Sequence, residues 1–409
     1  MPTPPPSPLT WAQQQDLQHC WHPFTDQAQW EKQPPLILTK AKGVWLYDEH
    51  DNRYFDGNSS IWTNIHGHSH PTIVEAIQRQ AATLSHSSYL GFGNDQACEL
   101  AHRLCAFFPK DTLSRCFFSD NGSTALEVAL KTSLQFRECL GEPQRDGIIT
   151  FSKAYHGDTL GAASIGGVSR FVRGYAQKGL TVHRVDDLDS VFSLPPEVVK
   201  TCSALVIEPL IQGVNQMRLW PPGMLAQLRK WTKKHHIHLI LDEVMTGFGR
   251  TGTMFACQQE NVTPDFLCLA KGLTGGAMPL AATLIQDEIY QTFKTANQTL
   301  FYGHSYTANP LGCAAALANL NVFDQENTLQ FLEEKGTFLQ NRLQPLNPRR
   351  LGLILAFETD NAPEICATLR RKGVLTRPIL DTIVLMPPLA STIEELTFLA
   401  DATLQATKT

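Results

Sequence analysis

Residues 238–252, HLILDEVMTGFGRTG, decide the fold, because an apolar run ends at an acidic residue and a glycine-rich turn follows. Such a run is typical of a buried strand, and it places Asp242 at the carboxyl end, where α/β sheets bind ligands. The apolar run 266–269 places Lys271 in the same way. A buried carboxylate beside a lysine is costly unless each has a partner. A pyridine-type cofactor would give each group a partner, since the carboxylate holds a ring N–H and the lysine forms an imine with an aldehyde. The alternative is a structural ion pair beside a solvated lysine.

Around this stretch, helix-like segments alternate with short apolar strands, which predicts an α/β fold with a mainly parallel sheet. The expected strands are 115–118, 147–151, 204–207, 238–241 and 266–269, and the expected helices include 72–84, 95–107 and 123–138. The pattern changes near Asn321 to α+β, with a helix at 326–343, a strand at 351–358, a helix at 363–372 and a strand at 377–386. Segments 37–47 and 53–55 alternate like two strands joined by a turn. We expect a proline-rich flexible arm over 1–18, a small domain built from 19–60 and 321–409, and a large domain over 61–320.

Composition excludes several classes of function. The chain has 34 Lys and Arg against 39 Asp and Glu, a net charge of −5 without a basic block, so nucleic-acid binding is not expected. Its apolar runs are strand-sized, far short of the roughly 18 residues that a membrane helix needs. The N-terminal MPTPPPSPLT lacks the features of a secretory signal. Ten cysteines without a C-x-x-C pair indicate a reduced, cytoplasmic protein, with no zinc.

Three further segments could contribute to a site at the strand ends. In SDNGSTALE, 119–127, a turn becomes a helix, which suits a phosphate; alternatively, Ser123 caps that helix with Glu127 one turn on. Tyr155, in AYHGDTLGA, could stack on a planar cofactor or belong to the core. Glu208, at another strand end, could line the site or form a structural salt bridge. The loop YGHSYTANPLGC, 302–313, is a second possible phosphate cradle.

Other polar residues have simpler explanations. His66, His68 and His70 alternate, as do His236 and His238, but the first set lies in a Gly-Ser loop without supporting carboxylates and the second has two members. We therefore expect no metal. Arg170 and Arg173 are expected to be surface charges.

In combination, DEVMTGFGRTG, LAKGLTGG, SDNGSTALEVALK and AYHGDT resemble the fold-type I, class III aminotransferases, which use pyridoxal 5′-phosphate. The resemblance covers nearly the whole chain from about residue 20. It is closest to members that aminate 8-amino-7-oxononanoate in biotin biosynthesis, on three passages: WHPFT at 21–25, DGNSSIWTNIHGHSHP at 56–71 and TRPILDTIVLMPP at 376–388. It implies a large, mainly parallel mixed-sheet domain and a smaller α+β domain formed by both termini. S-adenosylmethionine or lysine would be the amino donor.

The resemblance also implies roles for individual residues. Lys271 is the lysine that forms an imine with the cofactor, and Asp242 pairs with the pyridine nitrogen. The other implied cofactor contacts are Val244 on the ring, Gly122 and Ser123 on the phosphate, Tyr155 on the other ring face, and His304 and Ser305 on the phosphate of the neighbouring subunit in a homodimer. The implied substrate contacts are Phe24, Ile61, Trp62, Tyr155, Glu208, Lys271, Gly303 and Arg377, with Arg377 on a carboxylate. Asp158 matches an acidic residue near Tyr155.

Three departures from the family pattern bear on specificity. Phe24 stands where a tyrosine is common, Ile61 replaces one of two tryptophans, and Met245 stands where many members have glutamine. The last change argues against a general ω-amino-acid or ornithine enzyme, and the first two leave the donor open. The rival hypotheses are a broader ω-amine or diamine transaminase and a silent paralogue with a binding role. The intact Lys271 and Asp242 argue against the paralogue.

Overall fold

The computed structural model describes residues 8–168 and 179–408, and its centre is a seven-stranded sheet. The strand order is β4 (Leu113–Ser119), β12 (Ala281–Gln286), β11 (Phe266–Leu269), β10 (His238–Asp242), β7 (Cys202–Ile207), β5 (Gly147–Phe151) and β6 (Thr181–Val185). Strand β12 is antiparallel to both neighbours, and the pairs from β11 to β6 are parallel. Every residue of β10, β7, β5 and β11 is buried, as expected for a sheet covered on both faces. The predicted mixed, mainly parallel sheet is confirmed.

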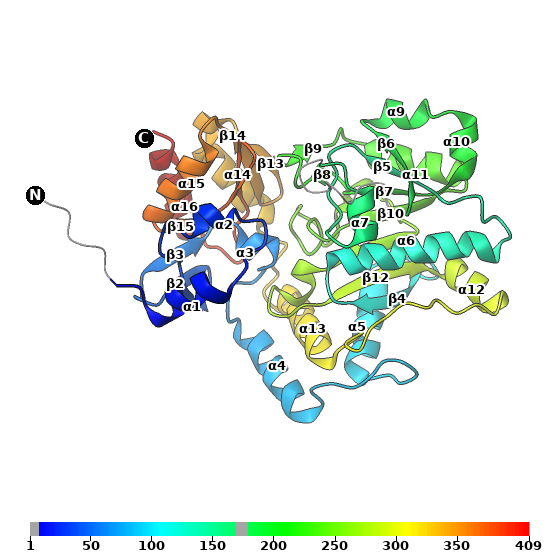
Figure 1. Ribbon diagram of the computed structural model, residues 1–409, viewed down its shortest axis with the longest axis horizontal. Helices are drawn as coiled ribbons and strands as arrows, with labels where there is room; N and C mark the ends of the chain where they lie inside the picture. Colours follow the sequence, from blue (N-terminus) through cyan, green and yellow to red (C-terminus); the bar gives the residue numbers. More distant parts are fainter. Residues whose placement is uncertain (1–7, 169–178, 409) are drawn as a thin grey trace, which may run out of the picture.

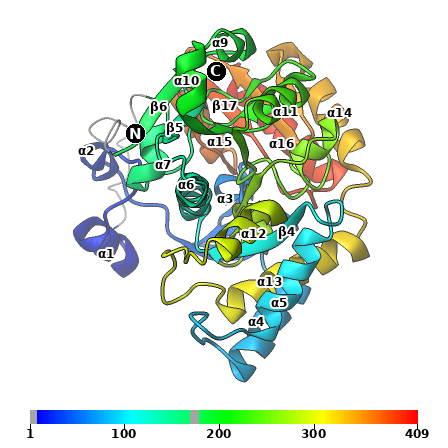
Figure 2. The ribbon, with the colours of Figure 1, turned by 90° about the vertical axis from the view of Figure 1, so that its right-hand side faces the viewer.

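Helices cover this sheet and extend from it. They are α4 (Pro71–Thr83), α5 (Asp95–Cys105), α6 (Gly122–Cys139), α7 (Leu160–Ile165), α9 (Leu188–Phe192), α10 (Pro196–Thr201), α11 (Met224–Lys234), α12 (Asp287–Thr295) and α13 (Pro310–Gln325). Helices α4, α5 and α13 pack together at one end of the molecule (Figures 1 and 2). Short elements lie between the strands: β8 (Ile211–Gln212), β9 (Arg218–Leu219), η1 (Ala256–Glu260) and η2 (Lys271–Thr274). No helix in the described ranges is long and apolar enough to cross a membrane.

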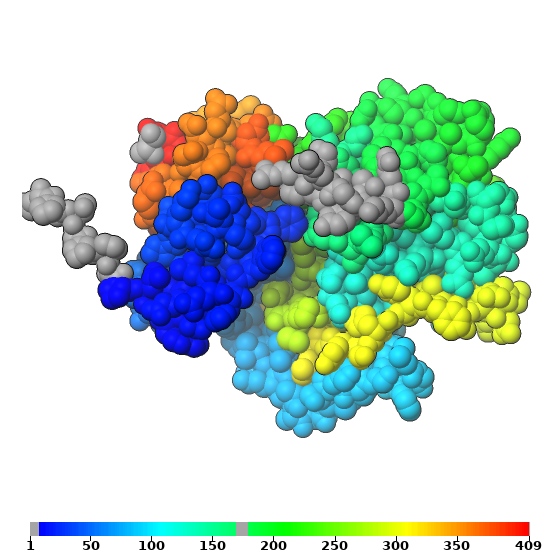
Figure 3. All heavy atoms as spheres, in the orientation of Figure 1, coloured from blue at the N-terminus to red at the C-terminus, as the bar shows by residue number. Residues whose placement is uncertain are grey.

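The two ends of the chain build a second, smaller α+β unit, as predicted (Figure 3). One sheet joins β1 (Leu38–Lys42), β2 (Trp45–Asp48) and β3 (Arg53–Asp56) to β15 (Val374–Leu375), which pairs with β3 in parallel. The other has the order β13 (Arg349–Leu351), β14 (Ile354–Glu358), β17 (Thr382–Leu385) and β16 (Pro378–Ile379). The remaining elements are α1 (Trp11–His19), α2 (Gln27–Trp30), α3 (Ser59–Trp62), α14 (Leu332–Arg342), η3 (Gln344–Leu346), α15 (Ala362–Arg371) and α16 (Ile393–Ala406).

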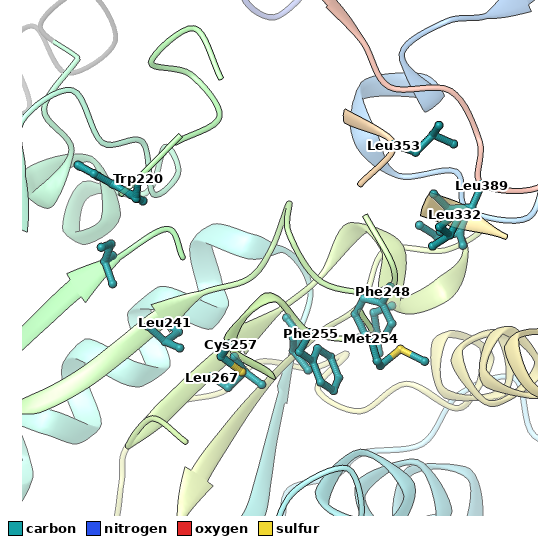
Figure 4. Packing of buried hydrophobic residues seen from close by; sticks show 14 of the residues in the cluster. Trp220, Leu241, Phe248, Met254, Phe255, Cys257, Leu267, Leu332, Leu353 and Leu389 are labelled. Carbon is teal, nitrogen blue, oxygen red and sulfur yellow. The ribbon is translucent and has the colours of Figure 1, made fainter. Parts of the chain in front are cut away.

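One hydrophobic core connects the two units. Phe248, Met254 and Phe255 lie between Leu241 and Leu267 of the central sheet and a group from the small unit, formed by Leu332, Leu353 and Leu389 (Figure 4). Each of these side chains is at most 8% exposed. Packing continues across the junction, so the strand ends and the small unit are held against each other.

Several predicted elements are corrected. The segments 37–47, 351–358 and 377–386 were expected to be single strands, but each is a hairpin closed by a two-residue turn. The first turn residue has a positive φ in each: Gly43, Gly352 and Leu380. The helix expected at 326–343 is shorter, since α13 continues to Gln325 and α14 begins at Leu332.

The N-terminal segment differs from the flexible arm expected over 1–18. Residues 11–19 form α1, and a capping box between Thr10 and Gln13 begins that helix. The Thr10 hydroxyl also donates to Glu49 at 2.9 Å, which ties α1 to the turn after β2. Residues 1–7, Arg170 and Arg173 lie outside the described residues.

Candidate active site

A cavity of about 720 Å³ opens at the carboxyl ends of the central strands. Five segments that each follow a strand supply much of its lining: Gly122 and Ser123 after β4, Tyr155 and Asp158 after β5, Glu208 after β7, Asp242 and Val244 at the end of β10, and Lys271 after β11. Trp62 and Met245 also line it. The predicted convergence of these residues at one edge of the sheet is therefore observed.

The Lys271 amine lies against an aromatic ring. Its Nζ is 4.6 Å from the ring centroid of Trp62, a cation–π distance. Burial lowers the pKa of Lys271 to about 8, although the negative charges of Asp242 and Glu208 oppose that change. A lysine with such a pKa has a substantial neutral, nucleophilic fraction near neutral pH.

Asp242 is fixed by two hydrogen bonds. His156 Nδ1 lies 2.7 Å from its Oδ2, and the backbone amide of Val244 donates to Oδ1 at 3.1 Å. Burial opposes protonation of His156, but the hydrogen bond and charge of Asp242, together with Glu208, outweigh it and raise the pKa of His156. The predicted site residues did not include His156. Its place beside Tyr155, just after a predicted strand, was the available signal.

The start of α6 faces the cavity with backbone amides. The helix is capped by Asn121, whose Oδ1 accepts from the Thr124 amide at 3.1 Å, so the alternative in which Ser123 caps it with Glu127 is wrong. Ser123 instead accepts a hydrogen bond from the Asp158 amide at 3.0 Å. A Cβ on Gly122 would lie 2.6 Å from a methyl of Val244. Glycine thus permits a close approach of helix start and strand end, and the first amides of the helix are suited to an anion.

Glu208 and Tyr155 form the adjacent wall. The Glu208 carboxylate accepts from the amides of Tyr155 at 3.2 Å and Gly213 at 2.9 Å, so backbone amides, and not the partner of a structural salt bridge, are its contacts at the cavity wall. Burial raises its pKa to about 7. The Tyr155 hydroxyl donates to Asp158 at 2.7 Å. Burial is the main cause that raises the pKa of Tyr155, and this hydrogen bond is the second.

Trp62 ends a segment with unusual backbone conformation. Ser59, Ser60, Ile61 and Trp62 have φ values of 46°, 49°, 61° and 71°, so four successive residues without glycine lie in the left-handed region. We call this segment, which coincides with α3, the left-handed turn. Left-handed backbone costs an L-residue roughly 1–2 kcal/mol, so other contacts must hold the turn in place. The motif had predicted that Trp62 lies at the site, but not this conformation.

The remaining predicted site residues do not line the cavity. These are Phe24, Ile61, Gly303, His304, Ser305 and Arg377. The Arg377 guanidinium donates to the Phe24 carbonyl, and both side chains are exposed. Arg377 is nevertheless close to the site in the chain. Ile379, two residues further on, packs against the hydrophobic cluster that includes the cavity residues Trp62 and Met245. His304 Nε2 lies 3.3 Å from the carboxylate of Asp120, a cavity residue.

The alternating histidines contact separate partners. His68 lies 2.8 Å from Asp56 and His70 lies 2.9 Å from Glu326, so carboxylates do accompany this set, contrary to expectation. His238 Nδ1 lies 2.8 Å from the Ser133 hydroxyl. In the described ranges, no group of three or more His, Cys, Asp or Glu side chains could hold a metal ion.

The donor set fits pyridoxal 5′-phosphate. The cofactor has three groups, and each finds a suitable partner in the cavity. The Lys271 amine is suited to the aldehyde, the fixed Asp242 carboxylate to the ring nitrogen, and the helix start at Gly122 to the phosphate. The family model of the class-III aminotransferases matches residues 27–406. The chain therefore belongs to this family of pyridoxal 5′-phosphate-dependent transferases.

Individual relatives narrow the comparison. Adenosylmethionine-8-amino-7-oxononanoate aminotransferase of Nitratidesulfovibrio vulgaris is 42% identical over 427 residues, which cover 93% of this chain and 78% of that protein. The crystal structure of the enzyme with the same name from Methanocaldococcus jannaschii is 35% identical, with a TM-score of 0.92, covering 97% of this chain and 98% of that one. A PLP-bound amine transaminase from an uncultivated Pseudomonas species is 30% identical, with a TM-score of 0.90, covering 95% and 98%.

Proposed function

We propose that this chain transfers an amino group to 8-amino-7-oxononanoate in biotin biosynthesis, with S-adenosylmethionine as the donor. The cavity that joins Lys271, Asp242 and Trp62 is the observation that carries the proposal. The names of the relatives support this choice of substrates over a broader amine transaminase, since identity to them reaches 42% over most of the chain.

The cavity residues divide the chemistry among them. When bound, pyridoxal 5′-phosphate supplies an aldehyde and an electron-withdrawing ring. Lys271 Nζ binds that aldehyde and, once released by the donor amine, takes the proton from the donor's α-carbon. The Asp242 carboxylate, oriented by His156 and the Val244 amide, holds a proton at the ring nitrogen. The amides of Gly122 and Ser123 bind the phosphate, and Val244 packs on the ring.

The outer residues select the substrates. Arg377 binds the carboxylate of the ketoacid, for which a planar guanidinium is suited. Trp62 contacts the substrate inside the cavity, and Phe24, Ile61 and Gly303 contact it on the path outside. Tyr155, oriented by Asp158, covers the ring face. The buried Glu208 is an acid on the same wall, and with its pKa raised to about 7 its neutral and charged forms are both populated near neutral pH.

We further propose a cytoplasmic homodimer in which His304 and Ser305 contact the phosphate of the neighbouring site. Large apolar side chains are exposed on the loops beside them: Leu90, Phe92, Phe301 and Tyr306 are all more than 60% exposed. Such a group on a protein surface is typical of an interface. Neither nucleic acid nor membrane is an expected partner.

Single-turnover spectroscopy of the purified, cofactor-loaded protein tests this function. S-adenosylmethionine and L-lysine are added separately, and conversion of the bound cofactor to its aminated form is followed by absorbance. The aminated enzyme then receives 8-amino-7-oxononanoate. Conversion by S-adenosylmethionine and return by the ketoacid are expected. Conversion of the cofactor by lysine alone would make lysine the donor in place of S-adenosylmethionine. Return of the aminated cofactor to its starting form only with other ketones would favour a broader ω-transaminase.

A further inference from the structure

The left-handed turn requires a stabilising contact that ordinary helix formation does not provide. None of its four residues is glycine, and Ile61 is β-branched, which makes its positive φ especially unfavourable. Strained backbone of this kind persists when surrounding contacts fix it, and it is concentrated at functional sites. The turn carries Trp62 to the Lys271 amine, so any residue that fixes the turn acts on the site.

Asp56 makes the most direct contacts with the turn. Its Oδ1 accepts from the Ser60 amide and its Oδ2 from the Ser60 hydroxyl, both at 2.8 Å. Oδ2 also lies 2.8 Å from His68 Nε2. Asp56 is 2% exposed, and it ends β3, where the strand is paired with β15. A carboxylate in this position is itself fixed, and it holds both the amide and the hydroxyl of Ser60.

Other contacts anchor the two ends of the turn, and in its middle the Thr63 hydroxyl donates to the Ser60 carbonyl at 3.1 Å. The Ser59 hydroxyl donates to the Met386 carbonyl at 2.6 Å, and Arg250 donates to the Asn64 carbonyl at 2.6 Å. Gly276 packs so closely on the following backbone that a Cβ would lie 2.9 Å from Asn64. Asp56 therefore holds the amide and the hydroxyl of Ser60 from outside the turn, and Ser59, Arg250 and Gly276 set where the turn begins and ends.

We propose that Asp56 is a positioning residue that holds the left-handed turn and thereby sets Trp62 against Lys271. Asp56 does not line the cavity, so its effect passes through Ser60 and the backbone to Trp62. The inference deepens the proposed function, on which it rests, because Trp62 is placed on the substrate path. A second aspartate shows the contrast: Asp48, 5% exposed, holds the turn after β2 through the amides of His50 and Asn52.

The test uses glycine to separate positioning from general stability. Asp56→Ala leaves Ser60 without its acceptor, and we expect the single-turnover rate with the amino donor to fall at least about tenfold, since small misplacements near the reacting groups are costly. Adding Ser60→Gly should restore the rate to within about threefold, because glycine adopts positive φ without a Cβ penalty. The control Asp48→Ala should remain within about twofold.

Two readouts accompany the rate. Visible circular dichroism of the bound cofactor should change in Asp56→Ala and return in the double variant, whether or not the donor is the one proposed. If Asp56→Ala does not fold, Ser60→Val replaces it, because Ser60 is exposed and a β-branched residue disfavours positive φ. Ser60→Val should then lose both signals while Ser60→Gly keeps them.

The proposal is overturned if Asp56→Ala keeps the wild-type rate and dichroism, or if glycine fails to restore them in a folded, cofactor-loaded protein. A loss reproduced by His68→Ala and not restored by glycine would assign the effect to the Asp56–His68 pair instead. Failure of the wild-type enzyme to react with either donor would refute the proposed function, and the dichroism would still decide the role of Asp56.

Discussion

The lowered pKa of Lys271 predicts that the apoenzyme binds its cofactor rapidly at neutral pH. The amine attacks an aldehyde only when neutral, and the amine becomes neutral as pH rises through its pKa. Burial moves that pKa from 10.5 to about 8. At pH 7 the neutral fraction is then about one tenth, roughly 300-fold more than an amine with the ordinary value would have.

Stopped-flow absorbance of cofactor binding between pH 6 and about 11 measures this effect. The rate constant should rise with pH and level off above a midpoint near 8. The matched control is the reaction of free pyridoxal 5′-phosphate with Nα-acetyl-lysine, whose amine has an ordinary pKa of about 10.4. The same titrating groups of the cofactor affect both reactions, so a difference in midpoint reports the amine.

A second variant checks the cause of the shift. The charge of Glu208 raises the pKa of Lys271, against the effect of burial. Glu208→Gln should therefore move the midpoint to lower pH, since the ammonium form loses a stabilising charge. A wild-type midpoint that coincides with that of Nα-acetyl-lysine, or a Glu208→Gln midpoint that moves upward, would refute this account of the site.

Three substitutions test other parts of the site. Lys271→Ala should abolish turnover and remove the absorbance of lysine-bound cofactor while the protein stays folded; activity near wild type would exclude the assigned role. Gly157→Ala places a Cβ 2.1 Å from the Ser123 hydroxyl, at φ +120°, so cofactor affinity should fall at least about tenfold in an equilibrium titration. Arg377→Ala should raise the KM for the ketoacid at least about tenfold without slowing the donor half-reaction, and an unchanged KM would contradict the carboxylate contact.

The predictable part of the site is the part encoded by short local patterns. Asp242, Lys271, Tyr155 and Glu208 each follow an apolar run, and the carboxyl ends of neighbouring strands meet at one edge of a sheet. The order and direction of the strands then bring these residues together without any further information. The alternation of helices and apolar strands predicted the mainly parallel sheet for the same reason, and its mixed character was implied by the family resemblance.

The contacts that escaped prediction depend on tertiary structure. Nothing in Ser-Ser-Ile-Trp indicates positive φ, because the turn is fixed by Asp56 and by Met386, which is more than 300 residues away. The contact between Arg377 and the Phe24 carbonyl likewise joins the two ends of the chain. His156 was overlooked because its role depends on its hydrogen bond with Asp242, which the sequence around His156 does not indicate.

The pairing of β3 with β15 has a consequence for how the protein is made. At about 5–20 residues per second, a ribosome takes roughly 15 to 60 s to add the segment between these two strands. During that interval the first three strands lack their fourth, and Ser59 lacks the Met386 carbonyl. A nascent chain that has passed residue 271 but not residue 386 already carries Lys271 and Asp242, while the turn that bears Trp62 still lacks its contact with the Met386 carbonyl. The contact that anchors this turn is thus supplied only after both Asp242 and Lys271 have been made.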